Sequence, residues 1–407
     1  MSGTVADALV AGLAERAETI VALAARLVRE PSSLPDTEAG VVRILQEEIA
    51  ALGLPAGEIV AREPSRPNLM IRLTGRRPGR RLILNGHTDT KPAGDPTRWS
   101  RDPWAATVEE GRLQGLGAAD MNGALAAMLH AGAAIVEAGL PDAGELVLLF
   151  SADEEGAGSA GLAHVLGSGA LGPGTNRDGA LETAALIGEP AGVESSFDTI
   201  PVVSRGFYGF TLRARGRTLH SSLSDRVPGA NAVEQLAAVI ADLRQTLTFE
   251  GATVNVATAI EGGIAPGVLP DSAVCRGDVR TPSGLDGAAV TAAIDKRLAE
   301  LRAADPSFRV ELVPDPEEWP ASVIPNDHRL VRALRDATGR VLGAAPPAGI
   351  FPGASEAFIF ERHGIHCIPA FGPGLLANAH APDEWVAVPD LIRAAQVYAL
   401  TAAAYLG

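Results

Sequence analysis

The sequence predicts an α/β protein whose main domain has a mixed, mostly parallel sheet with helices on both faces. Short apolar runs alternate with amphipathic stretches through the first half of the chain. From about residue 200 the order of elements becomes β-α-β-β-α-β, which predicts an inserted ferredoxin-like α+β domain. The 407 residues suffice for about two to three domains. We therefore expect one domain of residues 1–196 and 314–407, interrupted by an inserted domain of residues 197–313.

The first half supplies the strands of the main sheet and the helices that cover it. Apolar runs at residues 81–85, 145–150 and 184–187 predict buried strands. Apolar residues at helical spacing predict helices at 41–52 and 123–138.

The second half contains the insert and then the return to the first domain. In the insert we expect strands at 202–214, 252–260, 273–280 and 308–313, and helices at 230–247 and 285–303. Beyond the insert, we expect a helix at 328–342, a buried strand at 365–371 and a closing helix at 391–405.

Composition narrows the classes of partner. The 34 Lys+Arg and 49 Asp+Glu give a formal charge of −15, which opposes binding to nucleic acid and to anionic membranes. Hydrophobic residues make up 46% and charged residues 20%, as in a globular protein rather than a disordered one.

Cysteine usage and hydropathy indicate a location. Cys275 and Cys367 could form at most one bridge, so reduced thiols are the simpler interpretation. Charged residues interrupt residues 5–29, unlike the apolar centre of a signal peptide. The best apolar run, 124–136, contains His130 and is shorter than the roughly 18 residues of a spanning helix. We expect a soluble, cytoplasmic protein.

Histidine and acidic side chains follow several of the predicted strands. Because ligands bind at the carboxyl edge of open α/β sheets, these side chains converge if the sheet forms. His87 and Asp89 follow the strand at 81–85. Their spacing allows His87 to bind a metal ion while Asp89 accepts the hydrogen bond of the other ring nitrogen. Taken alone, a turn histidine beside a capping Asp is the simpler interpretation.

Acidic residues occupy the next two loops. Asp120 lies at the mouth of the helix at 123–138, where it would either cap the helix or bridge two cations. Glu154 and Glu155 follow Asp153 beyond the strand at 145–150. Since three adjacent acids repel each other, this loop is either solvated or stabilised by a dication. With a dication, one glutamate would ligate it and the other would face a bound water.

Two further candidates lie at the same predicted edge. Glu189 follows the strand at 184–187, and His380 follows the strand at 365–371. Two histidines with several carboxylates are ligands typical of zinc or a similar borderline metal rather than calcium. Five ligands exceed one tetrahedral site and suit two metals that share a bridging carboxylate.

The order of these motifs resembles that of a known family. The sequence contains His-x-Asp, Gly-x-x-Asp-Met, Asp-Glu-Glu-Gly, Gly-Glu-Pro and then a late His before Pro-Asp-Glu-Trp. This series is similar to that of the co-catalytic zinc hydrolases, which include acetylornithine deacetylase, succinyl-diaminopimelate desuccinylase, aminoacylase and carboxypeptidase G. The resemblance covers nearly the whole chain, including the insert.

The resemblance implies two Zn²⁺ per subunit, with Co²⁺ or Mn²⁺ as alternatives. In one site the implied ligands are His87, Glu189 and a bridging Asp120, and in the other they are Glu155, His380 and the same Asp120.

The resemblance also implies catalytic roles for two acids. Glu154 would be the general base, and Asp89 would orient His87. This agrees with general chemistry, since a metal lowers the pKa of bound water from 15.7 to about 7 and a nearby carboxylate then passes the proton to the leaving amine.

For the insert, the resemblance implies a homodimer and groups that bind substrate. His220 would reach the neighbouring subunit's active site and hydrogen-bond the developing oxyanion. Arg280 and Asn255 would hold a substrate carboxylate, and Ser355 lies in a 353–357 loop similar to a family loop that lines the pocket. On the sequence alone, a surface-turn histidine is the simpler interpretation of His220. The alternative for Arg280 or Asn255 is an ordinary sheet-face residue paired with an acid.

Two positions depart from the family pattern. Relatives often have Lys where this chain has Asn122, and often have Asp where it has Glu356. Neither departure removes a metal ligand, but both leave the substrate subclass open.

The predicted function is a metal-dependent amidohydrolase that cleaves the amide bond of an N-acyl amino acid or small peptide. Its substrate would be a small, carboxylate-bearing amide. The alternative is a non-catalytic dimeric scaffold that binds a ligand, which the intact candidates at every position disfavour. A serine hydrolase would need a Gly-x-Ser-x-Gly elbow, and 158–161 does not supply one. A Gly-x-Gly-x-x-Gly nucleotide site fails at Asp120, where the last glycine belongs.

Overall fold

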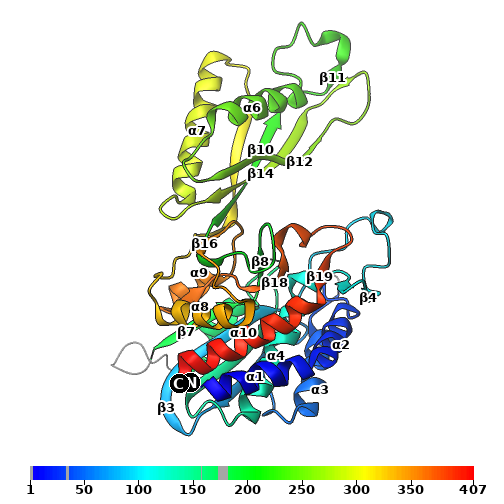
Figure 1. The fold of residues 1–407 in the computed structure, drawn as a ribbon. Helices are drawn as coiled ribbons and strands as arrows, with labels where there is room; N and C mark the ends of the chain where they lie inside the picture. Colours follow the sequence, from blue (N-terminus) through cyan, green and yellow to red (C-terminus); the bar gives the residue numbers. More distant parts are fainter. Residues whose placement is uncertain (1–2, 34–35, 157, 173–181) are drawn as a thin grey trace. The chain divides into compact units, whose positions relative to one another are not determined.

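The computed structural model describes residues 3–33, 36–156, 158–172 and 182–407, and the chain divides into two compact units (Figure 1). Unit 1 contains Met1–Val203, Val323–Phe351 and Ser355–Gly407, and unit 2 contains Ser204–Ser322 and Pro352–Ala354. The sequence interpretation placed the insert at 197–313. Unit 2 ends later because its last strand continues to Trp319.

Unit 1 is built on a six-stranded mixed sheet. Three of its neighbouring strand pairs are parallel and two are antiparallel, so the predicted mixed α/β class is confirmed. In spatial order the strands are β1 (Glu58–Val60), β2 (Asn68–Thr74), β6 (Ala143–Ser151), β3 (Arg77–His87), β7 (Thr183–Ile187) and β17 (His366–Ile368).

Eight helices are present in the described part of unit 1. They are α1 (Gly3–Glu15), α2 (Ala17–Val28), α3 (Ala39–Ala51), α4 (Gly123–Glu137), α5 (Leu162–Gly167), α8 (Arg329–Leu342), α9 (Ala357–Arg362) and α10 (Val388–Leu406). Helices α4 and α10 lie side by side on strands β3 and β6, while α1 and α2 pack against them (Figure 1). Most residues of α4 and α10 are buried because each is covered by both the sheet and other helices.

The segment Ala118–Glu137, which ends with α4, is long and apolar enough to cross a bilayer by length and composition. It is longer than the apolar run at 124–136, because the turn Ala118–Asn122 leads directly into the helix. However, 94% of its apolar 18-residue stretch is buried inside the protein. Buried core helices have the same length and composition, so the segment is weak evidence for a membrane span.

Shorter strands complete unit 1. An antiparallel sheet joins β4 (Thr107–Glu109), β5 (Arg112–Gln114) and β19 (Trp385–Ala387). Strand β8 (Pro190–Gly192) pairs in parallel with β18 (Gly372–Leu375), and β9 (Ile200–Ser204) pairs with β16 (Ala348–Phe351).

Unit 2 has a four-stranded antiparallel sheet and two helices. The sheet order is β12 (Thr253–Gly262), β14 (Ser272–Thr281), β10 (Gly206–Arg215) and β15 (Val310–Trp319). Helices α6 (Ala232–Thr246) and α7 (Gly287–Ala304) pack on it, and the side chains of Asn231 and Asp286 accept N–H groups of their first turns. A further short pair joins β11 (Leu219–His220) and β13 (Val268–Leu269).

The single strand expected at 202–214 is two strands in the structure. Strand β9 ends at Ser204 and β10 begins at Gly206. Chain order in unit 2 is therefore β10-α6-β12-β14-α7-β15, apart from the short pair.

The parallel core of the unit 1 sheet brings three loops together. Strands β6, β3 and β7 are adjacent and parallel, with His87 paired to Ser151 and Asn85 paired to Ile187. Their carboxyl ends therefore lie at one edge of the sheet, which places the residues that follow these strands close to each other.

Candidate metal centre

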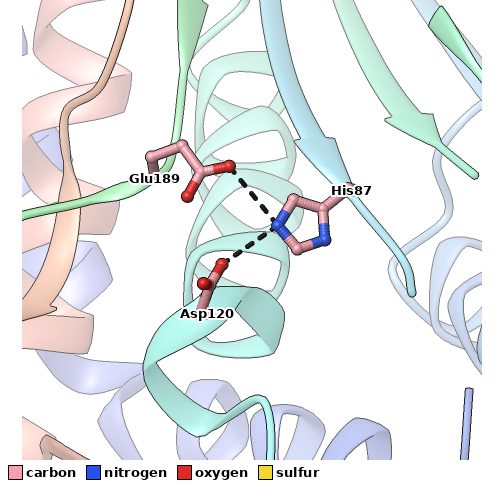
Figure 2. Close-up of side chains that lie close together, drawn as sticks. All are labelled: His87, Asp120 and Glu189. Atoms are coloured by element: carbon pink, nitrogen blue, oxygen red, sulfur yellow. Dashed lines mark hydrogen bonds and ion pairs between the residues drawn. The ribbon is translucent and has the colours of Figure 1, made fainter. Parts of the chain in front are cut away.

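One group of candidate ligands joins β3, β7 and the turn before α4. Figure 2 shows the Nε2 atom of His87 facing the carboxylates of Asp120 and Glu189. Nε2 is 3.0 Å from Oδ1 of Asp120 and 3.3 Å from Oε1 of Glu189. All three side chains are buried. The sequence interpretation placed these residues in one site, and the structure brings them together.

A second group uses the other oxygen of the same aspartate. The Nε2 atom of His380 is 3.2 Å from Oδ2 of Asp120 and 3.0 Å from Oε1 of Glu155. Glu155 comes from the loop after β6, and His380 from the loop before β19. Asp120 therefore lies between two histidines and belongs to both groups.

Asp120 does not act as a helix cap. It lies in a π turn, Ala118–Asn122, where its own φ of −121° and ψ of 89° are not helical. Helix α4 begins only at Gly123, and its N-cap residue Asn122 makes no side-chain capping bond. The Asp120 carboxylate is directed at His87 and His380 instead.

Asp89 supports the site differently from the prediction. We expected its carboxylate to accept the hydrogen bond of His87, but Nδ1 of His87 lies 2.9 Å from the backbone oxygen of Asp89 and 3.7 Å from its carboxylate. The carboxylate accepts the backbone N–H groups of Glu154 at 3.1 Å and Glu155 at 2.9 Å. Asp89 thus orients His87 through its main chain and fixes the glutamate loop through its side chain.

The protonation of the group around Asp120 reflects its excess of acids. Burial opposes charge on His87 and His380, but hydrogen bonds to Asp120 and its neighbours outweigh burial, raising the pKa of His380 to about 10 and that of His87 well above its usual range. Burial would raise the pKa of Asp120, yet the same bonds to His380 and His87 lower it. Burial, together with the charge of Asp120, raises the pKa of Glu189 to about 7.

Glu154 lies beside these groups without joining either of them. Burial raises its pKa well above the usual value, and the charges of Glu189, Glu155 and Glu356 add to this effect while His87 opposes it. A carboxyl group with a raised pKa takes up a proton more readily near neutral pH, as a general base must.

Several supporting residues were missed by sequence reasoning. Buried Glu38 accepts the backbone N–H of Asp153 at 3.0 Å, and Arg66 binds the carboxylates of both acids. The ammonium of Lys91 is 2.9 Å from Oε2 of Glu155. Glu384 accepts three backbone N–H groups around Asp120. These partners are far apart in the sequence, so no local pattern predicts that they pair. Glu384 does lie inside the Pro-Asp-Glu-Trp motif, but the motif does not indicate what it binds.

Ser355 is buried, and its hydroxyl accepts the N–H of Ala357 at the start of α9. The neighbouring Glu356 lies 3.4 Å from the hydroxyl of Ser151, and burial raises its pKa to about 8. The structure thus gives Ser355 a local structural contact and leaves substrate binding by this residue a prediction.

The remaining predicted residues lie in unit 2. Nδ2 of Asn255 donates to Asp278 at 3.2 Å, and Nε of Arg280 is 3.4 Å from the same carboxylate. The Arg280 guanidinium also lies over the ring of Phe207. His220 is exposed on β11, where Nδ1 accepts the N–H of Ser222.

The donor set fits divalent metal ions. Each group offers one imidazole nitrogen and two carboxylate oxygens that all lie within 4.8 Å of one another. Nδ1 of His87 donates to a carbonyl, so in the neutral imidazole that a metal requires, the lone pair of Nε2 faces the carboxylates of Asp120 and Glu189. Mixed nitrogen and oxygen donors match zinc and similar metals better than calcium.

An α/β fold with two groups of candidate metal ligands at one sheet edge is typical of metal-dependent enzymes. A family model described as Peptidase family M20/M25/M40 matches residues 83–404, and the chain belongs to this family. The resemblance inferred from the motifs is therefore confirmed. The chain is a hydrolase that acts on amide bonds, and the scaffold alternative is disfavoured.

Comparison with individual proteins agrees with this assignment. The chain is 31% identical over 389 residues to a succinyl-diaminopimelate desuccinylase of Gluconacetobacter diazotrophicus, covering 93% of this chain and 94% of that one. Its fold is similar to that of the di-peptidase Dug1p from Saccharomyces cerevisiae, with a TM-score of 0.77, 17% identity and coverage of 100% and 99%. A Bacillus subtilis protein described as a dinuclear metal binding peptidase from the M20 family gives a TM-score of 0.66, 20% identity and coverage of 96% and 98%.

Proposed function

We propose that the chain is a two-metal amidohydrolase that cleaves the amide bond of a small N-acyl amino acid or peptide carrying a carboxylate. The observation that carries this proposal is the position of Asp120, whose two oxygens face two different histidines. The metal ligands would be His87, Asp120 and Glu189 in one site, and Asp120, Glu155 and His380 in the other.

The preferred ions are two Zn²⁺, with Co²⁺ or Mn²⁺ as alternatives. The similar Bacillus subtilis protein is described as dinuclear, which supports the count of two. The site itself supports a need for cations, because acids outnumber bases among its described residues. The acids are Asp89, Asp120, Glu154, Glu155, Glu189 and Glu356, and the bases are His87, His380, Lys91 and Arg66. When bound, divalent ions would polarise the scissile carbonyl and lower the pKa of a water.

Three acids of the chain have separate roles in the proposed reaction. Glu154 takes the proton from the attacking water and delivers it to the nitrogen of the leaving amine. Asp89 holds the backbone of Glu154 in place through its accepted N–H. The adjacent Glu155 has a different task, because its Oε1 faces His380 and its Oε2 faces Lys91.

The acyl group is inferred from the relatives. Since relatives about 30% identical over nearly the whole chain are named succinyl-diaminopimelate desuccinylases, we infer an N-succinyl or similar N-acyl amino acid as the substrate. Arg280 and Asn255, which share Asp278 on one sheet face, would bind its carboxylate, and Ser355 would line the pocket.

The oligomeric state and the location complete the proposal. We infer a cytoplasmic homodimer in which unit 2 serves as lid and dimerisation domain. His220, which is exposed on β11, would donate to the developing oxyanion in the neighbouring subunit's site.

The test compares two adjacent glutamates. Glu154→Gln should keep wild-type zinc content while turnover falls about 10²–10⁴-fold, the usual range for loss of a general base. Its matched control, Glu155→Gln, should lose one of the two zinc equivalents, because Glu155 belongs to only one ligand group. Zinc is measured by elemental analysis, and turnover on acetyl-, succinyl- and aminoacyl-amino acids.

Either of two results would contradict the proposal. Loss of zinc in Glu154→Gln would mean that the base and ligand roles are misassigned. If zinc-loaded wild-type protein is inactive on all of the acyl-amino acids tested, the proposed substrate class is refuted.

A further inference from the structure

Glu384 is a buried acid outside the proposed ligands and the proposed base. It lies just before β19, in the same segment as His380, and is only 2% exposed. Its Oε1 accepts the backbone N–H groups of Ala119 at 2.8 Å and Asp120 at 3.0 Å, and its Oε2 accepts that of Gly117 at 3.0 Å. Three N–H groups thus converge on one carboxylate.

The turn around Asp120 needs such a partner because it is not regular helix. Within the turn, Ala118 donates to the carbonyl of Gly115 and Asn122 donates to that of Gly117. Glu384 accepts the N–H groups of Gly117, Ala119 and Asp120, which all lie before the first residue of α4, Gly123. Buried N–H groups without an acceptor are costly, and a group of them forms an anion-binding nest.

The segment that carries Glu384 is itself fixed in place. Its backbone oxygen accepts the N–H of Gly115 at 2.9 Å, and the next residue, Trp385, pairs with Gln114 of β5. The same short segment therefore supplies His380 to one ligand group and holds the backbone of the residue shared by both.

We propose that Glu384 is a positioning residue that fixes Asp120 for metal binding in both groups. This inference rests on the proposed two-metal function. A carboxylate suits the task since its two oxygens accept all three N–H groups. A glutamine offers one oxygen, and its NH₂ group would face an N–H donor. Because Asp120 is shared, its displacement weakens both sites and not only the one that contains His380.

The test is Glu384→Gln in the full chain, with Asp390→Asn as the matched control. Asp390 is also buried, lies six residues later, and its carboxylate binds Arg393 rather than the turn. Zn²⁺ is titrated into chelator-treated protein by calorimetry at 25 °C, and the melting temperature is recorded separately. We expect Glu384→Gln to bind both zinc equivalents about 10–100-fold more weakly, the effect typical of losing a partner that orients a ligand.

Further readouts separate positioning from general stability. Asp390→Asn should keep wild-type zinc affinity even if it melts earlier. Excess zinc should restore the kcat of Glu384→Gln, and KM should stay unchanged because the Glu384 carboxylate is bonded to the backbone of the turn and has no proposed role in substrate binding. Wild-type zinc affinity in Glu384→Gln, or a loss confined to one equivalent, would overturn the proposal.

Two outcomes keep this inference distinct from the proposed function. A wild-type protein that binds no zinc refutes the two-metal function itself. If Glu384→Gln does not fold, hydrogen exchange of metal-free wild-type protein decides the question. Protection of the N–H groups of Ala119 and Asp120 supports the proposal, and exchange as fast as in exposed loops overturns it.

Discussion

Acidification should destabilise unit 1 through His130, a buried histidine in α4. Its side chain is 1% exposed, and neither ring nitrogen has a hydrogen-bond partner in the described part of the chain. The nearest carboxylate oxygen of Glu48 is 4.0 Å from Nε2. Burial and the charge of Arg16 lower the pKa of His130 to about 4, and Glu137 only partly opposes them.

The magnitude follows from the difference between folded and unfolded chains. The unfolded histidine keeps the ordinary pKa of 6.5, so between pH 6.5 and 4 the unfolded chain binds more protons than the folded one. The free energy of unfolding therefore falls as the pH drops through this window and is unaffected by His130 outside it. Since one pKa unit corresponds to 1.36 kcal/mol, the full loss is about 3 kcal/mol, and about 2.5 kcal/mol at pH 4.5.

The assay is urea unfolding of metal-free protein at pH 7, 5.5 and 4.5, for the wild type and His130→Leu. Other groups titrate equally in both proteins, so the difference between them isolates His130. His130→Leu should gain about 2.5 kcal/mol relative to wild type between pH 7 and 4.5. The exposed control His363→Leu should show no such gain. Parallel pH profiles for wild type and His130→Leu would refute the reasoning.

Three further predictions concern the site. Asp89→Asn should lower the free energy of unfolding by about 1–3 kcal/mol in urea, because one N–H of Glu154 or Glu155 loses its acceptor; unchanged stability would contradict this. His220→Ala should keep its zinc but lose turnover, and mixing it with Glu154→Ala should restore some activity; no recovery between exchanging subunits excludes donation across the interface. Arg280→Ala should raise KM at least tenfold in steady-state assays, and an unchanged KM would remove it from substrate binding.

Much of the fold and the candidate site could be predicted because both depend on local pattern. The apolar runs that became β3, β6 and β7 are continuous, since these strands are buried on both faces. His87, Glu155 and Glu189 follow β3, β6 and β7, so the expected sheet edge was enough to group these three. His380 lies farther along the chain than expected, beyond β18 in the segment before β19. The antiparallel strand β2, at Asn68–Thr74, was not among the expected elements.

What could not be predicted depends on contacts between distant segments. The bonds from Glu384 to the turn at Asp120, and from Glu38 to Asp153, join positions more than 100 residues apart. Asp89 shows a different limit, because the loop backbone directs its carboxylate to the N–H groups of Glu154 and Glu155. Residue spacing alone does not determine which atom of Asp89 meets His87.

The most direct measurement is the zinc stoichiometry of chelator-treated and reloaded protein, compared between wild type, Asp120→Ala and His380→Ala. If both groups of ligands depend on one shared carboxylate, wild type should hold two ions per chain, His380→Ala one, and Asp120→Ala none at the same free zinc concentration. An Asp120→Ala variant that keeps one tightly bound ion would show that the two groups do not share this residue.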